Sequence, residues 1–164
     1  MQRSQARETA FIYYFEKLFN PEISWDELTE LAAESEVLQG DAFTRTLFEA
    51  AVVSVEEADG EIRRYLKNWR LERLPKTVLA ILRLSVAELL STKDVPPGVV
   101  ANEAVELAKK YATPKDASFI NGVLGSFIRA RQKPAEPAAS AGAEAPAETA
   151  APAGPAADEG AGQA

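Results

Sequence analysis

Three apolar stretches follow one another between Leu74 and Arg131, and they constrain the fold of this chain more than any other feature. The breaks between them are Asp94-Val95-Pro96-Pro97 and Thr113-Pro114, and proline disfavours helix in the residue before it. Within each stretch the apolar residues recur at helical spacing, and no part of the chain shows sustained strand alternation between hairpin turns. The sequence therefore predicts an all-α protein.

Four more helices are expected ahead of this region, which makes seven. Asn20-Pro21 stops the first helix, and Ser24 with Glu27 forms a capping box that opens the second. Asp59-Gly60 is expected to end the third helix and to separate it from the fourth. Thr113 is expected to be the N-cap of the seventh helix, with Pro114 as its first residue. The expected ranges are approximately 4–19, 24–35, 41–58, 61–68, 75–92 and 98–112, with the seventh starting after Thr113.

The fifth expected helix carries apolar residues on more than one side. Val78, Leu82 and Leu89 share its broad face, whereas Ile81 and Leu84 lie well off that face. A helix that is apolar on several sides belongs at the centre of a bundle. We therefore expect the other helices to pack around it.

The composition changes abruptly after residue 133. Residues 134–164 are almost entirely Ala, Pro, Gly and Glu, with no aromatic residue and no Leu, Ile or Val. Such a segment buries too little apolar surface to offset the entropy lost on ordering. We therefore expect one folded domain over residues 1–133 and a disordered tail over residues 134–164.

The chain contains no Cys and no His. This excludes disulfides, thiolate zinc sites and nucleophile pairs that depend on histidine. No apolar run approaches the roughly 20 residues that span a bilayer, and the N-terminus lacks a signal-peptide layout. The expectation is a cytoplasmic protein that is not an enzyme, with no cofactor, metal, membrane or small-molecule substrate.

Net charge has to be divided by region. The formal charge of −7 splits into about −2 for residues 1–133 and about −5 for the tail. Strong binding to phosphate normally needs more positive charge than such a body provides. If RNA is the ligand, a local basic patch must bind it, and a second protein is expected to supply part of the site.

Several short runs carry a resemblance to a known family. They are Ala6-Arg7-Glu8, the run from Ile81 to Leu89, Asp94-Val95-Pro96, the run from Asn102 to Lys109, and Phe119-Ile120-Asn121-Gly122-Val123-Leu124. In this order and spacing they resemble the NusB family of transcription antitermination factors. The resemblance implies a bundle of two small helical subdomains. It also implies a protein that binds boxA RNA together with the ribosomal protein NusE and helps the RNA polymerase elongation complex to resist termination in ribosomal RNA operons.

Three arginines are candidate RNA contacts, each with a structural alternative. Arg3 and Arg7 match the basic N-terminal segment with which the family contacts RNA, but Arg7 could instead pair with a carboxylate. Arg83 lies in line with Ala80 and Ala87, whose small side chains would leave its guanidinium accessible to a phosphate. The alternative for Arg83 is a salt bridge inside the bundle.

The seventh helix supplies the remaining candidates. Its expected core face is Ile120, Val123, Leu124 and Phe127, and two glycines lie roughly opposite, where this packing does not explain them. A bare groove with a cation at each end would admit an RNA backbone or a partner segment, unless another helix crosses there. This opposite face consists of Lys115, Ser118, Gly122, Gly125 and Arg129.

Two functions remain open on the sequence alone. The first is a non-enzymatic RNA-binding adaptor of the antitermination machinery. The second is a helical protein–protein scaffold with reduced RNA affinity, because Ser118 stands where the family usually has lysine and the body is nearly neutral. An enzyme is the least favoured class, since no acid–base or nucleophile constellation is recognisable.

Overall fold

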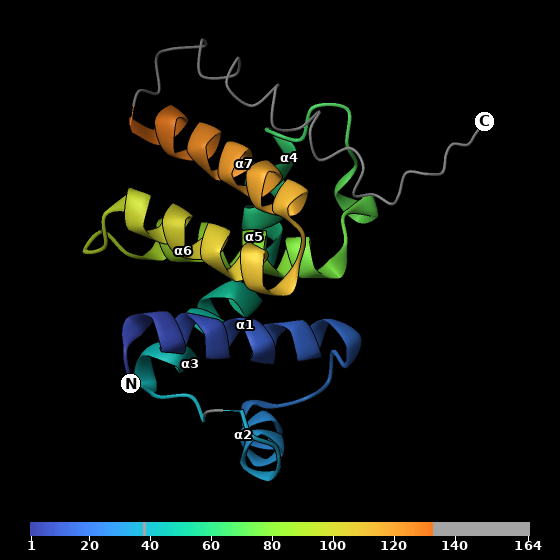
Figure 1. Cartoon of the computed structure of the whole chain (residues 1–164), viewed down its shortest axis with the longest axis vertical. Helices are drawn as coiled ribbons and strands as arrows, with labels where there is room; N and C mark the ends of the chain where they lie inside the picture. The colour runs from blue at the N-terminus through green and yellow to red at the C-terminus, as the bar shows by residue number, and fades with distance from the viewer. Residues whose placement is uncertain (38, 133–164) are drawn as a thin grey trace, which may run out of the picture.

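The computed structural model describes residues 1–37 and 39–132, and these residues form seven α-helices and one short 3-10 helix (Figure 1). The all-α fold class is confirmed, whereas the expected tail lies outside the described residues. The helices are α1 (Arg3–Phe19), α2 (Trp25–Glu34), α3 (Ala42–Val53), α4 (Val55–Arg63), η1 (Leu71–Arg73), α5 (Lys76–Ser91), α6 (Pro97–Tyr111) and α7 (Pro114–Gln132).

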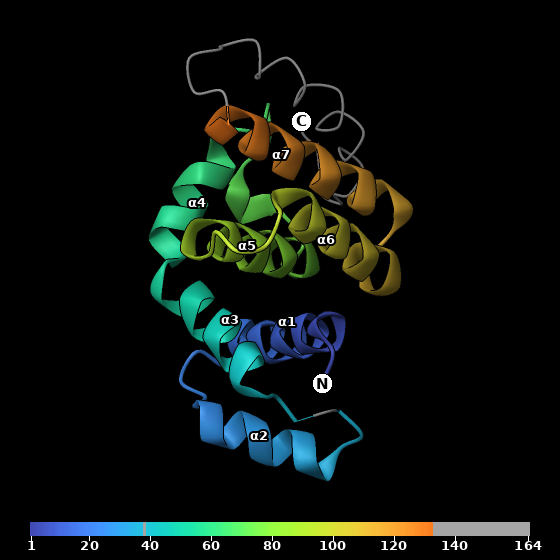
Figure 2. The ribbon, with the colours of Figure 1, turned by 90° about the vertical axis from the view of Figure 1, so that its left-hand side faces the viewer.

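The helices form two groups stacked along the long axis of the molecule. In Figures 1 and 2, α1, α2 and α3 make up the lower part, and α4 to α7 the upper part. Helix α5 packs against α1, α3, α4, α6 and α7, so it joins the two groups. This arrangement agrees with the expected pair of small helical subdomains.

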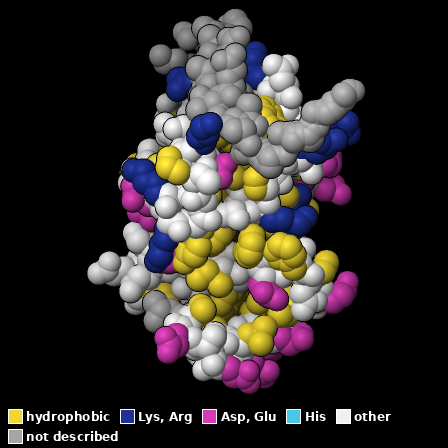
Figure 3. Space-filling model, turned by 45° about the vertical axis from the view of Figure 1, so that its right-hand side comes forward, with side chains coloured by type: hydrophobic (Ala, Val, Ile, Leu, Met, Phe, Trp, Pro, Cys, Tyr) yellow, Lys and Arg dark blue, Asp and Glu magenta, His cyan; other side chains and the backbone are white. Residues whose placement is uncertain are grey.

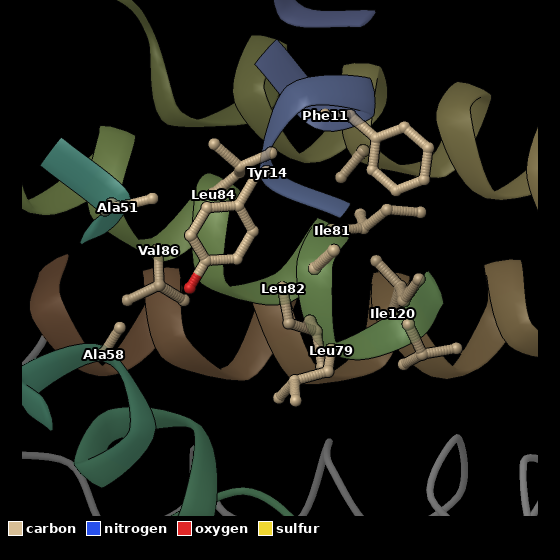
Figure 4. Close-up of a cluster of buried hydrophobic side chains, with 14 of the residues drawn as sticks. Phe11, Tyr14, Ala51, Ala58, Leu79, Ile81, Leu82, Leu84, Val86 and Ile120 are labelled. Carbon is tan, nitrogen blue, oxygen red and sulfur yellow. The ribbon is translucent and has the colours of Figure 1, made fainter. Parts of the chain in front are cut away.

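Helix α5 is the centre of the core, as its apolar residues on several sides predict. Ten of its sixteen residues are buried, and Ile81 and Leu82 have no exposed surface. Figure 4 shows Leu79, Ile81, Leu82, Leu84 and Val86 of this helix among buried side chains from α1, α3, α4 and α7.

The expected helix starts are confirmed at α2 and α7. The backbone N–H of Glu27 donates to Ser24 Oγ at 3.1 Å, and the backbone N–H of Ser24 donates to the Glu27 carboxylate at 3.1 Å. At α7 the backbone N–H of Asp116 donates to Thr113 Oγ1 at 3.0 Å, and Pro114 is the first helical residue. Both caps satisfy backbone donors that a helix start leaves without an intrahelical partner.

The expected break at Asp59-Gly60 is wrong. The chain breaks five residues earlier, at Ser54, whose hydroxyl donates to the carbonyl of Ala50 at 2.6 Å and whose φ and ψ are −102° and 24°. Asp59 and Gly60 lie inside α4, where Asp59 accepts two hydrogen bonds from Arg83. Helix α4 also ends earlier than expected, at Arg63 rather than at Asn68. Asn68 lies in the following connection and adopts a left-handed φ of 61°.

Within the described residues, no helix combines the length and the apolar character needed to cross a membrane.

Candidate nucleic-acid interface

An open groove of about 790 Å³ runs between α6 and α7. Small and amide side chains form much of its surface. Cations are present at its rim, because Lys109 and Arg129 line it and both are exposed. The residues that contribute small or amide surface are Gly98, Ala101 and Asn102 of α6, and Ala117, Ser118, Asn121 and Gly125 of α7.

The predicted outer face of α7 contributes three of its five residues to this groove. Ser118, Gly125 and Arg129 line it, whereas Lys115 and Gly122 do not. The predicted core face of α7 is confirmed, since Ile120, Val123, Leu124 and Phe127 are each at most 2% exposed. Thus α6 packs alongside α7 and forms one wall of the groove, and no helix crosses over Gly125 in the described structure.

Because Gly125 has no side chain, the surface of α7 beside Arg129 is not filled. A Cβ built at Gly125 would lie 3.3 Å from Arg129 Nη1, which is the end of a flexible side chain. Arg129 also donates from Nη2 to Ser126 Oγ at 3.3 Å. The Arg129 guanidinium therefore lies close to the space that a side chain at position 125 would occupy.

Arg3 is exposed at the start of α1. Its Cζ lies 3.8 Å from the centre of the Phe43 ring, a cation–π contact that orients the side chain without neutralising its charge. The next residue, Ser4, donates from Oγ to the Glu103 carboxylate at 2.9 Å, which joins the start of α1 to α6. Arg3 thus remains available to a phosphate near the helix that forms one wall of the groove.

Arg7 adopts the structural alternative. Its Nε and Nη2 donate to the Glu88 carboxylate, with the shortest contact at 2.6 Å, and the two side chains are 8% and 4% exposed. The hydrogen bond to Glu88 raises the pKa of the Arg7 guanidinium against the opposing effect of burial. The pair ties α1 to α5 inside the core and leaves little of Arg7 for an external ligand.

Arg83 is also held inside the bundle. Its Nε and Nη2 donate to the two Asp59 carboxylate oxygens at 2.7 and 2.8 Å, and its Nη1 lies 3.5 Å from the hydroxyl of Tyr14. Because α4 packs against this side of α5, the Arg83 side chain is only 14% exposed. The accessible guanidinium that the flanking alanines suggested is not observed.

Glu8 connects α1 to the C-terminal end of α6. It accepts hydrogen bonds from Lys110 and from the hydroxyl of Tyr111. Burial alone would raise the pKa of the Glu8 carboxyl, but the hydrogen bonds from Lys110 and Tyr111 lower it on balance. Burial and the hydrogen bond to Glu8 raise the pKa of Tyr111 to about 12.

Two features of the charge distribution escaped the sequence reasoning. One is the set of carboxylates that hold the arginines, Glu88 and Asp59, which only the packing of distant helices reveals. The other is a run of exposed cations between residues 63 and 76, which the local density of Lys and Arg in the sequence would have indicated. No group of three or more acidic residues placed to hold a metal ion occurs in ranges 1–37 and 39–132.

Fold and groove together define the class of the protein: a helical bundle with an open groove between its last two helices. Comparison with known proteins then gives the family. A model described as the NusB family matches residues 4–129, which is more than half of the chain. The chain belongs to the NusB family.

Individual relatives agree with this assignment. The chain is 38% identical over 128 residues to transcription antitermination protein NusB of Dictyoglomus turgidum, covering 78% of this chain and 85% of that protein. It is 40% identical over 141 residues to NusB of Clostridium botulinum strain Loch Maree, covering 78% of this chain and all of that protein.

Solved structures show the same fold. The solution structure of NusB from Aquifex aeolicus superimposes with a TM-score of 0.68 and 34% identity, covering 82% of this chain and 94% of that chain. A crystal structure of antitermination factors NusB and NusE in complex with dsRNA superimposes with a TM-score of 0.66 and 35% identity, covering 78% of this chain and 96% of that chain.

Proposed function

We propose that this protein is an RNA-binding transcription antitermination factor that binds boxA-type RNA together with NusE. In this role it supports transcription of ribosomal RNA operons by acting on the RNA polymerase elongation complex, and it catalyses no reaction. The observation that carries the proposal is the groove between α6 and α7, which combines exposed cations with small and amide side chains. Such a surface suits a phosphodiester chain, because phosphate contacts fix register and orientation.

The candidate residues fall into two groups, those that contact RNA and those that hold the helices in position. Arg129 and Lys109 contact phosphate at the groove, and Gly125 and Ser118 leave room for the RNA backbone beside α7. Arg3 and Lys115 extend the cationic surface, since both are exposed. Arg7 and Arg83 support the site indirectly, because their ion pairs fix α1 and α4 against α5.

NusE supplies the part of the RNA site that this chain lacks. Residues 1–133 carry a formal charge of about −2, so few phosphates can be neutralised by this protein alone. The solved complex in which a similar NusB binds NusE and dsRNA supports a composite surface. We therefore expect RNA affinity to depend strongly on the partner.

The second candidate function is a protein–protein scaffold with reduced RNA affinity. It is favoured by the burial of Arg7 and Arg83 in ion pairs, which withdraws two of the predicted cations from the RNA site. The two functions differ in whether RNA contributes to the complex at all.

A titration of boxA RNA, with and without purified NusE, tests the proposal. The expected result is RNA binding that weakens with added salt and tightens when NusE is present, whereas an RNA of scrambled sequence binds more weakly. Arg129→Gln should weaken the complex, and Arg45→Gln provides a matched control at an exposed cation away from the groove. Capture of NusE without any RNA response, alone or together, would establish the scaffold function instead.

A further inference from the structure

The connection between α4 and α5 carries the densest run of positive charge in the chain. Six of the 18 Lys and Arg residues lie between residues 63 and 76, against one acidic residue in the same interval. All six are exposed: Arg63, Arg64, Lys67, Arg70, Arg73 and Lys76. Although residues 1–133 are nearly neutral overall, positive charge is thus concentrated in residues 63–76, here called the cationic segment.

Buried leucines hold the cationic segment against the core. Leu66, Leu71 and Leu74 are 5%, 4% and 8% exposed. Successive turns are closed by backbone hydrogen bonds, such as that from the N–H of Trp69 to the carbonyl of Leu66 at 3.0 Å. The leucines fix the path of the segment, so the cations between them are presented to solvent at set positions.

Internal ion pairs use only part of this charge. Arg63 pairs with Glu72 at 3.1 Å and Arg64 with Glu61 at 3.6 Å, and both arginine side chains stay more than half exposed. Exposed pairs of this kind contribute little to stability. Lys67, Arg70, Arg73 and Lys76 form no salt bridge with any residue in ranges 1–37 and 39–132. Folding alone does not account for these four charges.

The last turns of α7 connect the cationic segment to the groove. Ile128 and Arg129 line the groove. On the inner side of the same turn, the Phe127 ring contacts the Tyr65 ring of the cationic segment, with 6.4 Å between centres. Arg131 is exposed beyond them, its Cζ 5.4 Å from the Phe127 ring, and α4 packs against α7.

We propose that the cationic segment is a second RNA-binding surface, which holds the phosphodiester backbone of single-stranded RNA that flanks the element bound in the groove. The proposal rests on the function proposed above and extends the path of the RNA past Arg131. Contacts made by Lys67, Arg70 and their neighbours are to phosphate, so they add affinity and salt dependence without adding sequence preference.

The test compares two RNAs and two charge-matched variants of the full chain in the presence of NusE. One RNA is confined to the boxA element, and the other carries the same element with flanking single strand on both sides. The test variant is Lys67→Gln/Arg70→Gln. The control variant, Lys17→Gln/Arg45→Gln, removes two cations beside α2, where Lys17 donates to the carbonyl of Ile23 and Arg45 lies over the Trp25 ring, and it changes the net charge equally.

The expected result is specific to the longer RNA. The test variant binds it about tenfold more weakly, and the slope of log affinity against log salt falls by about 1.4, or about 0.7 for each phosphate that the variant no longer neutralises. The short RNA binds all three proteins alike, and the control variant matches the parent on both RNAs. Thermal unfolding of the test variant is unchanged, because both side chains are exposed.

Three results would overturn the inference, and they are distinguishable. If the parent binds both RNAs and the test variant does so equally well, the second surface is wrong while the proposed function stands. If the parent binds neither RNA with NusE present, the proposed function and the inference fail together. If the test variant loses NusE rather than RNA, the cationic segment is a protein-docking surface.

Discussion

The Arg7–Glu88 ion pair is buried on both sides, so removal of either partner leaves a charge without compensation. Arg7→Met is therefore expected to lower the free energy of unfolding by about 3–5 kcal/mol, measured by urea denaturation. The double variant Arg7→Met/Glu88→Leu should lose less than the single variant, since no isolated charge remains in the core. Arg45→Met, at an exposed pair with Glu49, is the control and should cost less than about 1 kcal/mol. An Arg7→Met protein as stable as the parent would contradict the burial of this pair.

Because Glu8 links α1 to α6 through its carboxylate, the stability of the protein is expected to depend on pH. The pKa of its carboxyl is lowered below the ordinary value of 4.5 by hydrogen bonds from Lys110 and Tyr111 that outweigh burial. A lowered folded-state pKa means that the carboxylate stabilises the fold fully above about pH 4.5, and that this contribution is lost as pH falls through the folded-state pKa. Glu8→Gln should therefore reduce the melting temperature at pH 7, and the gap to the parent should narrow towards pH 3. A gap that stays constant with pH would show that Glu8 acts through packing rather than charge.

At the scale of the helix, substitutions at Gly125 can distinguish the contribution of this residue to the stability of α7 from its contribution to RNA binding. No glycine in ranges 1–37 and 39–132 has a positive φ, and only the end of Arg129 lies close to a Cβ at this position. Gly125→Ala should thus raise the free energy of unfolding by about 0.5–1 kcal/mol with little effect on RNA affinity. Gly60→Ala in α4, where nothing lies within 4 Å of the added Cβ, should give a similar gain.

The larger substitution Gly125→Leu is expected to fill the groove and to weaken RNA binding in an anisotropy titration while the helix remains folded. Unchanged RNA affinity in the Leu variant would move the RNA path away from this part of α7.

The helices also show what the sequence could and could not predict. Caps such as Ser24 with Glu27, and prolines such as Pro114, act within a few residues, so the corresponding helix starts were predictable. The break at Ser54 was not, because Gly60 is a local breaker that the Asp59–Arg83 contact keeps inside α4. The role of Arg83 was undecided for the same reason: its carboxylate partner is 24 residues away in the chain and is brought close only by packing. Local signals therefore predicted the elements, and distant contacts decided which arginines remained exposed.

Over the whole molecule, charge is separated along the long axis. Between residues 18 and 44 there are seven acidic residues and no Lys or Arg. In Figure 3 the lower end, which α2 forms, shows acidic side chains and none of the dark-blue Lys or Arg side chains that appear higher up. We therefore expect an approaching RNA to be repelled at the end formed by α2 and attracted towards the proposed sites at the groove and the cationic segment. The net charge of about −2 on residues 1–133 thus conceals an uneven charge distribution.

This separation predicts an effect on association rather than on the bound state. Glu30→Gln/Glu34→Gln/Glu36→Gln removes three exposed negative charges from the α2 end, and it should raise the RNA association rate constant by about two- to threefold at low salt. The dissociation rate constant should not change, because the three residues lie far along the chain and the long axis from the groove. Near 1 M salt, where the Debye length is about 3 Å, the variant and the parent should associate equally fast in stopped-flow measurements. A change in dissociation, or a rate increase that persists at high salt, would instead place the RNA against α2.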